Sequence, residues 1–273
     1  MCGIVGFCNL KGEPAQVGLL KRMTDTIAHR GPDGEGHHVD GPVGLGHRRL
    51  AIIDTSLAGK QPMANETGEV IITYNGMIYN FQKLRVELQL AGHCFRSQAD
   101  TEVIVHAYEE WGENSVKRFN GMFAFVIWDK RNQELFLARD RYGIKPLYYA
   151  FVDGHFLFAS ENKAILEHPA VTRELDLEAL LEYFTFQNFF TDRTLLRDIK
   201  IFPAGCWAKL PVDFTGQELS HQRYLDLRHG IENLRCPKAH LQREKLPRQL
   251  KRAENEDQEE SEDDPDEDLA EEQ

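Results

Sequence analysis

The chain opens with a pattern of apolar and polar positions that predicts a strand, a helix and two further strands. Residues 2–9 form an almost continuous apolar run, which is typical of a short buried strand. In residues 16–30 the apolar side chains recur at helical spacing, and the sequence HRGPDG predicts the end of that helix. Strand-like runs follow at residues 43–53 and 69–80.

Two helices are predicted in the next part of the chain. Asn80 is a candidate N-cap for a helix that extends to Leu90 and is closed by Gly92. Asp100 is a candidate N-cap for a second helix over residues 101–111, because its carboxylate can accept hydrogen bonds from the free N–H groups of the first turn.

From residue 121 the pattern changes to a series of strands. Four short, aromatic-rich runs are separated by turn residues: MFAFVIWD, ELFLARD, PLYYAFVDG and HFLFASE. Helical patterns return at residues 161–168 and 176–186, and a last strand is expected at 201–210. Antiparallel strands with helices on either side predict a layered α+β sandwich.

Beyond residue 211 this pattern weakens, and charge divides the remainder in two. We expect a folded domain over residues 1–211, a basic and weakly structured extension over 212–252, and an acidic disordered tail over 253–273. The last 20 residues hold 13 carboxylates and no Lys or Arg, which accounts for the net charge of −12. The rest of the chain is nearly neutral, so neither nucleic-acid nor membrane binding is indicated.

The apolar runs and the cysteines indicate a cellular location. The sequence holds no run of 18 apolar residues and no basic segment leading into a long apolar stretch, so we expect neither a membrane span nor a secretory signal. Five cysteines are widely spaced, without a CxxC pair: Cys2, Cys8, Cys94, Cys206 and Cys236. This spacing argues against a disulfide framework and a zinc site, so we expect reduced thiols, a cytoplasmic location and no metal.

Cys2 follows Met1 directly, and this position has chemistry of its own. A small second residue favours removal of Met1, which would place the Cys2 thiol beside its own α-amine. Such an amine has a pKa of about 7.7–8.0, so a useful fraction is neutral near pH 7 and can take the thiol proton. The segment therefore predicts an N-terminal nucleophile; the alternative is a buried cysteine in an ordinary first strand.

Nine segments form an ordered series: MCGIVGF (1–7), HRGPDG (29–34), GHRRLAIID (46–54), QPM (61–63), YNGMIYN (74–80), ADTEVI (99–104), FNGMFAFVIWD (119–129), ARDRYGIKPLYY (138–149) and FASENKAIL (158–166). This series resembles the glutaminase domain of glutamine-hydrolysing asparagine synthetase, a class II glutamine amidotransferase. The resemblance covers residues 1 to about 210. It implies the four-layer αββα sandwich of the N-terminal nucleophile hydrolases, which agrees with the α+β pattern above.

The resemblance also implies roles for individual residues. Cys2 would attack the amide carbon of glutamine and form a thioester, while the Asn75 side chain and the Gly76 backbone N–H would form the oxyanion hole. Arg49 would bind the α-carboxylate of glutamine, and Asp100 would bind its α-ammonium. The backbone of one segment would line the pocket: Arg49, Leu50, Ala51, Ile52 and Ile53.

Each of these residues also has a purely structural interpretation. Asn75-Gly76 is a strong turn signal, and Asp100 can be only a helix cap. Arg48 and Arg49 can be surface charges on an edge strand, and HRGPDG can be only a helix stop. The order of the segments along one chain favours the functional interpretation.

The chain departs from the family pattern in two places. The family usually has Glu at the position of Met77, where the carboxylate helps to bind the substrate ammonium, so we expect weaker glutamine binding here. The SGGxDS loop of the family's synthetase domain, which would use ATP and magnesium, is not found. We therefore expect no cofactor on this chain. It would be a truncated product, a glutaminase that serves a separate synthetase subunit, or a protein with a new role.

Two functions of different classes fit these features. The first is an enzyme that hydrolyses L-glutamine to glutamate and ammonia, for transfer to an acceptor such as activated aspartate, with a homo-oligomer or a synthetase subunit as possible assemblies. The second is a non-catalytic regulatory or interaction protein built on the same sandwich, which would bind partners through its basic segment and acidic tail.

Overall fold

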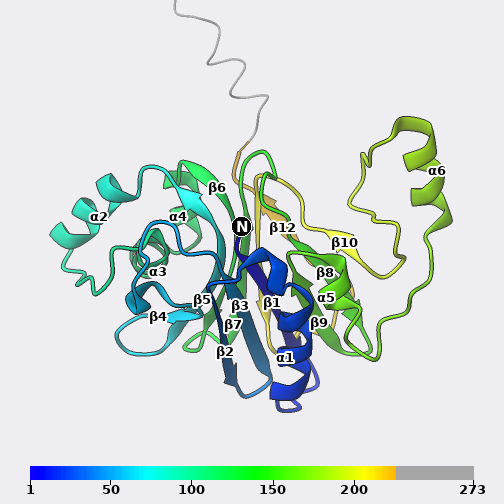
Figure 1. The fold of residues 1–273 in the computed structure, drawn as a ribbon, viewed down its shortest axis with the longest axis horizontal. Helices are drawn as coiled ribbons and strands as arrows, with labels where there is room; N and C mark the ends of the chain where they lie inside the picture. The colour runs from blue at the N-terminus through cyan, green and yellow to red at the C-terminus, as the bar shows by residue number, and fades with distance from the viewer. Residues whose placement is uncertain (226–273) are drawn as a thin grey trace, which may run out of the picture. The chain divides into compact units, whose positions relative to one another are not determined.

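The computed structural model describes residues 1–225, which form two stacked antiparallel sheets with helices on both outer faces (Figure 1). The first sheet has the strand order β10-β8-β9-β1-β3-β2. Its strands are β1 (Gly3–Asn9), β2 (Gly34–Asp40), β3 (Val43–Arg49), β8 (Tyr148–Val152), β9 (His155–Ala159) and β10 (Lys200–Ile201).

The second sheet has the order β12-β11-β7-β6-β5-β4. Its strands are β4 (Met63–Ala64), β5 (Val70–Ile78), β6 (Gly121–Asp129), β7 (Glu134–Arg139), β11 (Cys206–Pro211) and β12 (His221–Arg223). β1 in the first sheet and β6 in the second are central strands, because each pairs with a neighbour on both sides over most of its length.

The helices divide between the two outer faces. Those on the first sheet are α1 (Val17–Thr26) and α5 (Asn162–Ile165), and those on the second are α2 (Phe81–Leu90), α3 (Asp100–Trp111) and α4 (Ser115–Arg118). Short 3-10 turns lie at Ala28–Arg30, Leu57–Gly59 and Gly112–Asn114. The remaining helix, α6 (Leu177–Phe186), stands away from the sheets in Figure 1.

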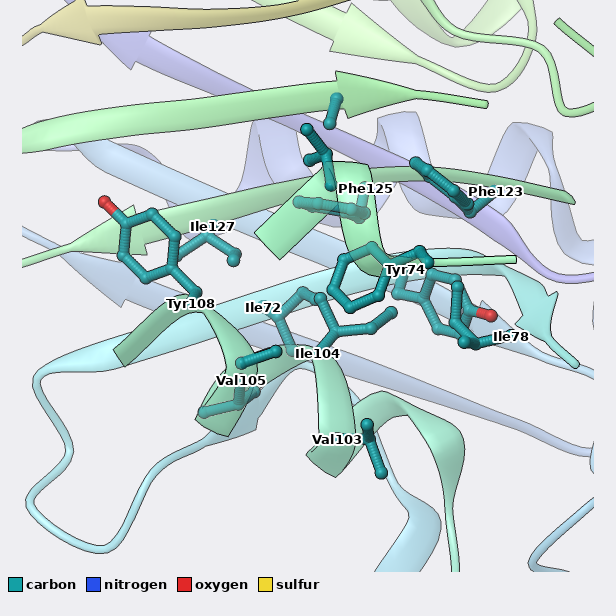
Figure 2. Close-up of a cluster of buried hydrophobic side chains, with 14 of the residues drawn as sticks. Ile72, Tyr74, Ile78, Val103, Ile104, Val105, Tyr108, Phe123, Phe125 and Ile127 are labelled. Atoms are coloured by element: carbon teal, nitrogen blue, oxygen red, sulfur yellow. The ribbon is translucent and has the colours of Figure 1, made fainter. Parts of the chain in front are cut away.

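The alternation of side chains along each strand produces the layers, because successive residues of a strand point to opposite faces. In β1, Ile4 packs between the sheets and Val5 packs under α1. In β6, Val126 packs between the sheets whereas Phe125 packs toward α3 (Figure 2). Three buried apolar clusters therefore separate four layers, and the predicted αββα sandwich is confirmed.

Several predicted boundaries differ from the structure. The strand expected at 43–53 ends at Arg49, because the next two backbone N–H groups are bound by side chains outside the sheet. The strand expected at 201–210 is two strands in different sheets, separated by a turn in which Gly205 has φ +65°. The helix expected at 161–168 is only the single turn α5. The edge strand β2 was not predicted, because its sequence GEGHHVD has almost no apolar residues.

The helices at 81–90 and 176–186 lie where they were expected, but neither predicted N-cap, Asn80 or Asp100, acts as a side-chain cap; a residue that was not predicted as a cap, Asp176, does. Asp176 caps α6, since its Oδ1 accepts from the N–H groups of Glu178 and Ala179 at 3.0 Å. Asn80 stands at the N-cap of α2 without a side-chain cap bond; its Oδ1 accepts from Asn120 N at 2.9 Å instead. Asp100 is the first residue of α3 and not its N-cap.

The last strand extends the folded unit past residue 211. Residues Met1–Leu225 form one unit, in which β12 pairs with β11 and the Tyr224 hydroxyl donates to the Arg139 carbonyl at 2.8 Å. The expected boundary at 211 falls inside this unit. Residues 226–252 of the predicted basic extension and the predicted acidic tail, 253–273, lie outside the described residues.

Cys2, Cys8, Cys94 and Cys206 are free thiols, and Cys236 lies outside the described residues. Across residues 1–225, no helix has both the length and the apolar character needed to cross a bilayer.

The four-layer packing predicts a large loss of stability when a buried side chain between two layers is truncated. Phe125 is fully buried between β6 and α3, so Phe125→Ala should lower the free energy of unfolding by about 3–5 kcal/mol, measured by urea denaturation. Val86 on α2 is 56% exposed, and Val86→Ala should change it by no more than about 0.5 kcal/mol. Equal effects of the two changes would contradict the layer assignment.

Candidate functional site

One cavity of about 160 Å³ is lined by all the residues that the resemblance places in the glutamine site. It lies at the start of β1, the end of β3, the end of β5 and the first turn of α3. The predicted residues on its wall are Cys2, Arg49, Leu50, Ala51, Ile52, Ile53, Asn75, Gly76, Met77 and Asp100. Four segments that are distant in the sequence therefore meet at one place.

Cys2 precedes β1, and its thiol is held against the segment after β3. The Leu50 N–H donates to Cys2 Sγ at 3.3 Å, and the Leu50 carbonyl lies 3.5 Å from the same sulfur. Arg30 Nε donates to the Cys2 carbonyl at 2.9 Å, which fixes the backbone. Burial raises the pKa of the Cys2 thiol, although the Leu50 N–H and Arg49 act in the opposite direction. Burial therefore favours the protonated thiol, and a nucleophilic role calls for a base.

Asn75 faces Cys2's side of the sandwich because of strand alternation. Two residues earlier, the Thr73 hydroxyl donates to the Gly46 carbonyl of the other sheet at 3.0 Å, so Thr73 and Asn75 share the inter-sheet face. Asn75 is only 1% exposed. Its Nδ2 has no hydrogen-bond partner within residues 1–225. A buried amide donor without an acceptor is costly, and it is available to a ligand in the cavity.

The backbone N–H of Gly76 points to the edge of β5 that faces away from β6. Its partner on β6 is Phe123, whose N–H and carbonyl both bond to Asp140 on the β7 side. Gly76 and Phe123 are therefore a non-hydrogen-bonded pair, and the Gly76 N–H points away from β6. A Cβ at Gly76 would lie 2.3 Å from the Met122 carbonyl oxygen, so only glycine fits here.

The edge of β5 that Gly76 faces carries two further side-chain contacts. Gln61 Oε1 accepts from the Tyr74 N–H at 2.7 Å, and Asp100 Oδ2 accepts from the Ile78 N–H at 2.9 Å. The Tyr74 hydroxyl also donates to Asp100 Oδ2 at 2.8 Å. Asp100 thus bonds across to β5, rather than acting as the helix cap that was expected. Burial raises the pKa of the Asp100 carboxyl despite these donors.

The two arginines at the end of β3 point to different surroundings. β3 lies between β1 and β2, so it is not the edge strand considered from the sequence. Arg48 forms ion pairs with Asp25 and Glu35 on the outer side of the sheet. Arg49 lines the cavity, where Nη1 donates to the Ser56 carbonyl at 2.8 Å and Nη2 to that of Asp54.

The HRGPDG segment supports the wall formed by residues 50–53. Asp33 N donates to the Arg49 carbonyl at 3.0 Å, and Asp33 Oδ2 accepts from the Ala51 N–H at 2.9 Å. A Cβ at Gly31 would lie 2.3 Å from the Arg48 carbonyl carbon, so this close approach needs glycine. The segment therefore does more than end a helix.

The sequence did not single out three buried residues at this site. Lys145 lines the cavity and is 5% exposed, with Nζ 3.2 Å from Met1 Sδ, and burial lowers the pKa of its ammonium. His47 is fully buried, its Nε2 lies 3.1 Å from the Tyr74 carbonyl, and burial lowers the pKa of its ring to about 3. Gln61 joins the wall at β5. All three lie inside the segments of the ordered series, which was the available signal.

The residues that line the cavity, all within 1–225, do not include a group of side chains that could hold a metal ion. Within residues 1–225, one group of histidine and carboxylate side chains could hold an ion, and it consists of His93, His106 and Glu109, which do not line the cavity.

Comparison with known proteins gives the same family. A family model described as "Glutamine amidotransferase domain" matches residues 1–225. The chain is 43% identical over 184 residues to asparagine synthetase [glutamine-hydrolyzing] 2 of Bacillus subtilis, covering 66% of this chain and 24% of that protein. It is 45% identical over 187 residues to asparagine synthetase [glutamine-hydrolyzing] 3 of the same organism, covering 67% of this chain and 30% of that protein.

The chain thus spans about a quarter to a third of the length of these curated relatives. Among solved structures, glutamine phosphoribosylpyrophosphate amidotransferase from B. subtilis has a similar fold, with a TM-score of 0.61 and 20% identity. The likeness covers 82% of this chain and 49% of that one. These matches confirm the resemblance of the ordered segments: the chain belongs to the glutamine amidotransferase domain family and is similar to the glutamine-hydrolysing asparagine synthetases.

Proposed function

We propose that this chain hydrolyses L-glutamine to glutamate and ammonia, with Cys2 as nucleophile. The observation that carries the proposal is the amide donor of Asn75, which has no partner in the described part of the chain (1–225) and is buried on the wall of the cavity that also holds the Cys2 thiol. A pre-organised donor of this kind suits an oxygen that gains negative charge during the reaction.

The proposed reaction starts with removal of Met1, which frees the α-amine of Cys2. Because burial raises the pKa of the thiol, the amine must take the thiol proton as the sulfur attacks the amide carbon of glutamine. The carbonyl oxygen becomes an oxyanion, which the Asn75 Nδ2 and the Gly76 N–H stabilise. The proton then passes from the α-ammonium to the leaving nitrogen, so that ammonia departs and a thioester remains. Water hydrolyses the thioester and releases glutamate.

Substrate binding is proposed to use the charged groups on the wall. Arg49 would bind the α-carboxylate of glutamine, Asp100 would bind the α-ammonium, and the backbone of residues 50–53 would enclose the side chain. Met77 also lines the cavity, and its thioether supplies no charge. Asp100 is therefore the main counter-charge proposed for the ammonium.

We further propose that the ammonia is transferred to an acceptor such as activated aspartate, in keeping with the names of the similar asparagine synthetases. Activation of that acceptor would use ATP and magnesium on a synthetase part, whether in a separate subunit or in a longer form of this protein. A cytoplasmic location fits the four free thiols of residues 1–225. A homo-oligomer is a possible assembly.

Removal of the nucleophile tests the proposal and its non-catalytic alternative together. Cys2→Ala should abolish glutamine-dependent ammonia release, whereas Cys94→Ala, at an exposed thiol, should leave it unchanged. Ammonia is measured with a coupled dehydrogenase, and intact mass should show that Met1 is absent. Equal background rates for wild type and Cys2→Ala would reject the enzyme proposal and favour an interaction protein.

Loss of the amide donor should slow the reaction without weakening the fold. Asn75→Ala should lower kcat by about 100- to 1000-fold, the usual effect of one oxyanion donor. Because Asn75 Nδ2 has no partner within residues 1–225, the melting temperature should stay the same or rise. A lower melting temperature with an unchanged kcat would show that Asn75 serves structure alone.

A carboxylate at position 77 should restore substrate binding. Met77→Glu adds one charged hydrogen bond to the substrate ammonium, worth about 1.5–3 kcal/mol, so kcat/KM should rise by about 10- to 100-fold through KM. Met77→Leu, the apolar control, should leave kcat/KM near the wild-type value. If Met77→Glu gives no improvement, the proposed position of the ammonium is wrong.

A further inference from the structure

Two histidines and a glutamate converge where the segment after α2 meets α3. His93 lies three residues past the end of α2, and His106 and Glu109 lie one helical turn apart on α3. Each side chain offers one nitrogen or oxygen, and these three atoms lie within 4.8 Å of one another. His106 Nδ1 and Glu109 Oε2 are 3.0 Å apart. That spacing is close to the ligand separation of about 3.3 Å that Zn–N bonds of about 2.0 Å give in a tetrahedral site.

Carboxylates outnumber Lys and Arg side chains around the rings of His93 and His106. Glu109 Oε2 and Glu110 Oε2 lie 3.0 and 3.2 Å from ring nitrogens of His106 and His93. Glu66 Oε1 and Glu102 Oε1 lie 3.6 and 3.9 Å from His106 Nε2. Within residues 1–225, none of these four carboxylates forms an ion pair with Lys or Arg. A divalent cation among them would offset this excess of negative charge.

His106 gives a second, independent indication of a missing ligand. The residue is 1% exposed, and its Nε2 has no hydrogen-bond partner within residues 1–225. A buried ring nitrogen without a partner is costly in either tautomer. A cation bound at Nδ1, beside Glu109 Oε2, lowers this cost, because the ring proton then lies on Nε2 and faces the Glu66 and Glu102 carboxylates at 3.6 and 3.9 Å. This pairing is the usual one for metal-binding histidines.

The groups behind the cluster hold its ligands in place. Asn65 Nδ2 donates to Glu109 Oε1 at 2.7 Å, which leaves Oε2 on the side of His106. Glu110 contacts one ring nitrogen of His93 and leaves the other free. Outer contacts of this type orient metal ligands and increase their basicity.

We propose that His93, His106 and Glu109 bind a divalent transition-metal ion, of which Zn²⁺ fits best. Two imidazoles and one carboxylate are a ligand set that suits zinc, and a fourth position is left for water. The ion would link the segment after α2 to α3. The same helix carries Asp100 in its first turn, about 9 Å from His106 along the helix axis. The ligands do not line the cavity, so the site is separate from the proposed glutaminase chemistry.

The test uses the full chain, freed of metal with a chelator and then titrated with zinc chloride. Metal content after gel filtration should reach one zinc per chain, and the melting temperature should rise by about 5–10 °C when zinc is in large excess over its Kd. His93→Ala and Glu109→Gln should each lose most of this rise. His221→Ala, at an exposed histidine far along the chain, and Cys2→Ala should both retain it.

Cobalt substitution identifies the ligands. A site of imidazole and carboxylate should give visible d–d bands without the near-ultraviolet thiolate-to-cobalt band that a cysteine site would give. His93 is half-buried in the segment after α2, so the metal-free His93→Ala protein should melt close to the metal-free wild type. The proposal is overturned if wild type binds no stoichiometric zinc, if both ligand variants bind it equally well, or if the thiolate band appears and disappears with Cys2→Ala.

Discussion

The pairing register between β5 and β6 is the constraint on which the site depends. It makes Gly76 and Phe123 a non-hydrogen-bonded pair, so the Gly76 N–H is free for the cavity and Asn75 faces the other sheet. A slip of one residue would turn Asn75 toward α3 and place the Gly76 N–H in the ladder. Asp140 secures this register, because its fully buried carboxylate accepts the Phe123 N–H at 3.1 Å.

The Asp140 carboxylate also holds the loop that carries Lys145, a residue on the cavity wall. Asp140 also accepts the backbone N–H groups of Tyr142, Ile144 and Lys145, at 2.9–3.1 Å. It therefore shapes the loop that brings the Lys145 side chain to the cavity. One buried acid thus positions backbone on β6 and on the loop after β7, and neither contact involves the cavity directly. The geometry of the site is set by supporting residues as much as by those on its wall.

Burial determines the electrostatic character of the cavity. It raises the pKa values of Cys2 and Asp100 and lowers that of Lys145, so each group is pushed toward its neutral form. Such surroundings strengthen any charge contact that a zwitterionic substrate makes, because water screens it poorly. The surroundings of His93 and His106 differ from those of the cavity. Several carboxylates lie near these two rings, and in residues 1–225 no Lys or Arg pairs with them.

The sequence by itself determined the layered class and the candidates for the site. Period-two and helical patterns are local, so β5, β6, α2 and α3 could be placed from composition and spacing alone, and the ordered segments indicated the family. It could not determine where β3 ends or that β10 and β11 belong to different sheets. Those boundaries depend on partners far away in the chain, such as Cys2 Sγ for the Leu50 N–H.

Only the tertiary structure decided which polar groups lack a partner. The Asn75 amide and the His106 ring, each with one unpartnered nitrogen within residues 1–225, look ordinary in a sequence, because burial and hydrogen bonding are properties of the assembled layers. Cysteine spacing in a sequence bears on only one kind of zinc site, whereas His93 and Glu109 come together only through the packing of the segment after α2 on α3. Local pattern fixes which elements form, and long-range contact fixes what their side chains can do.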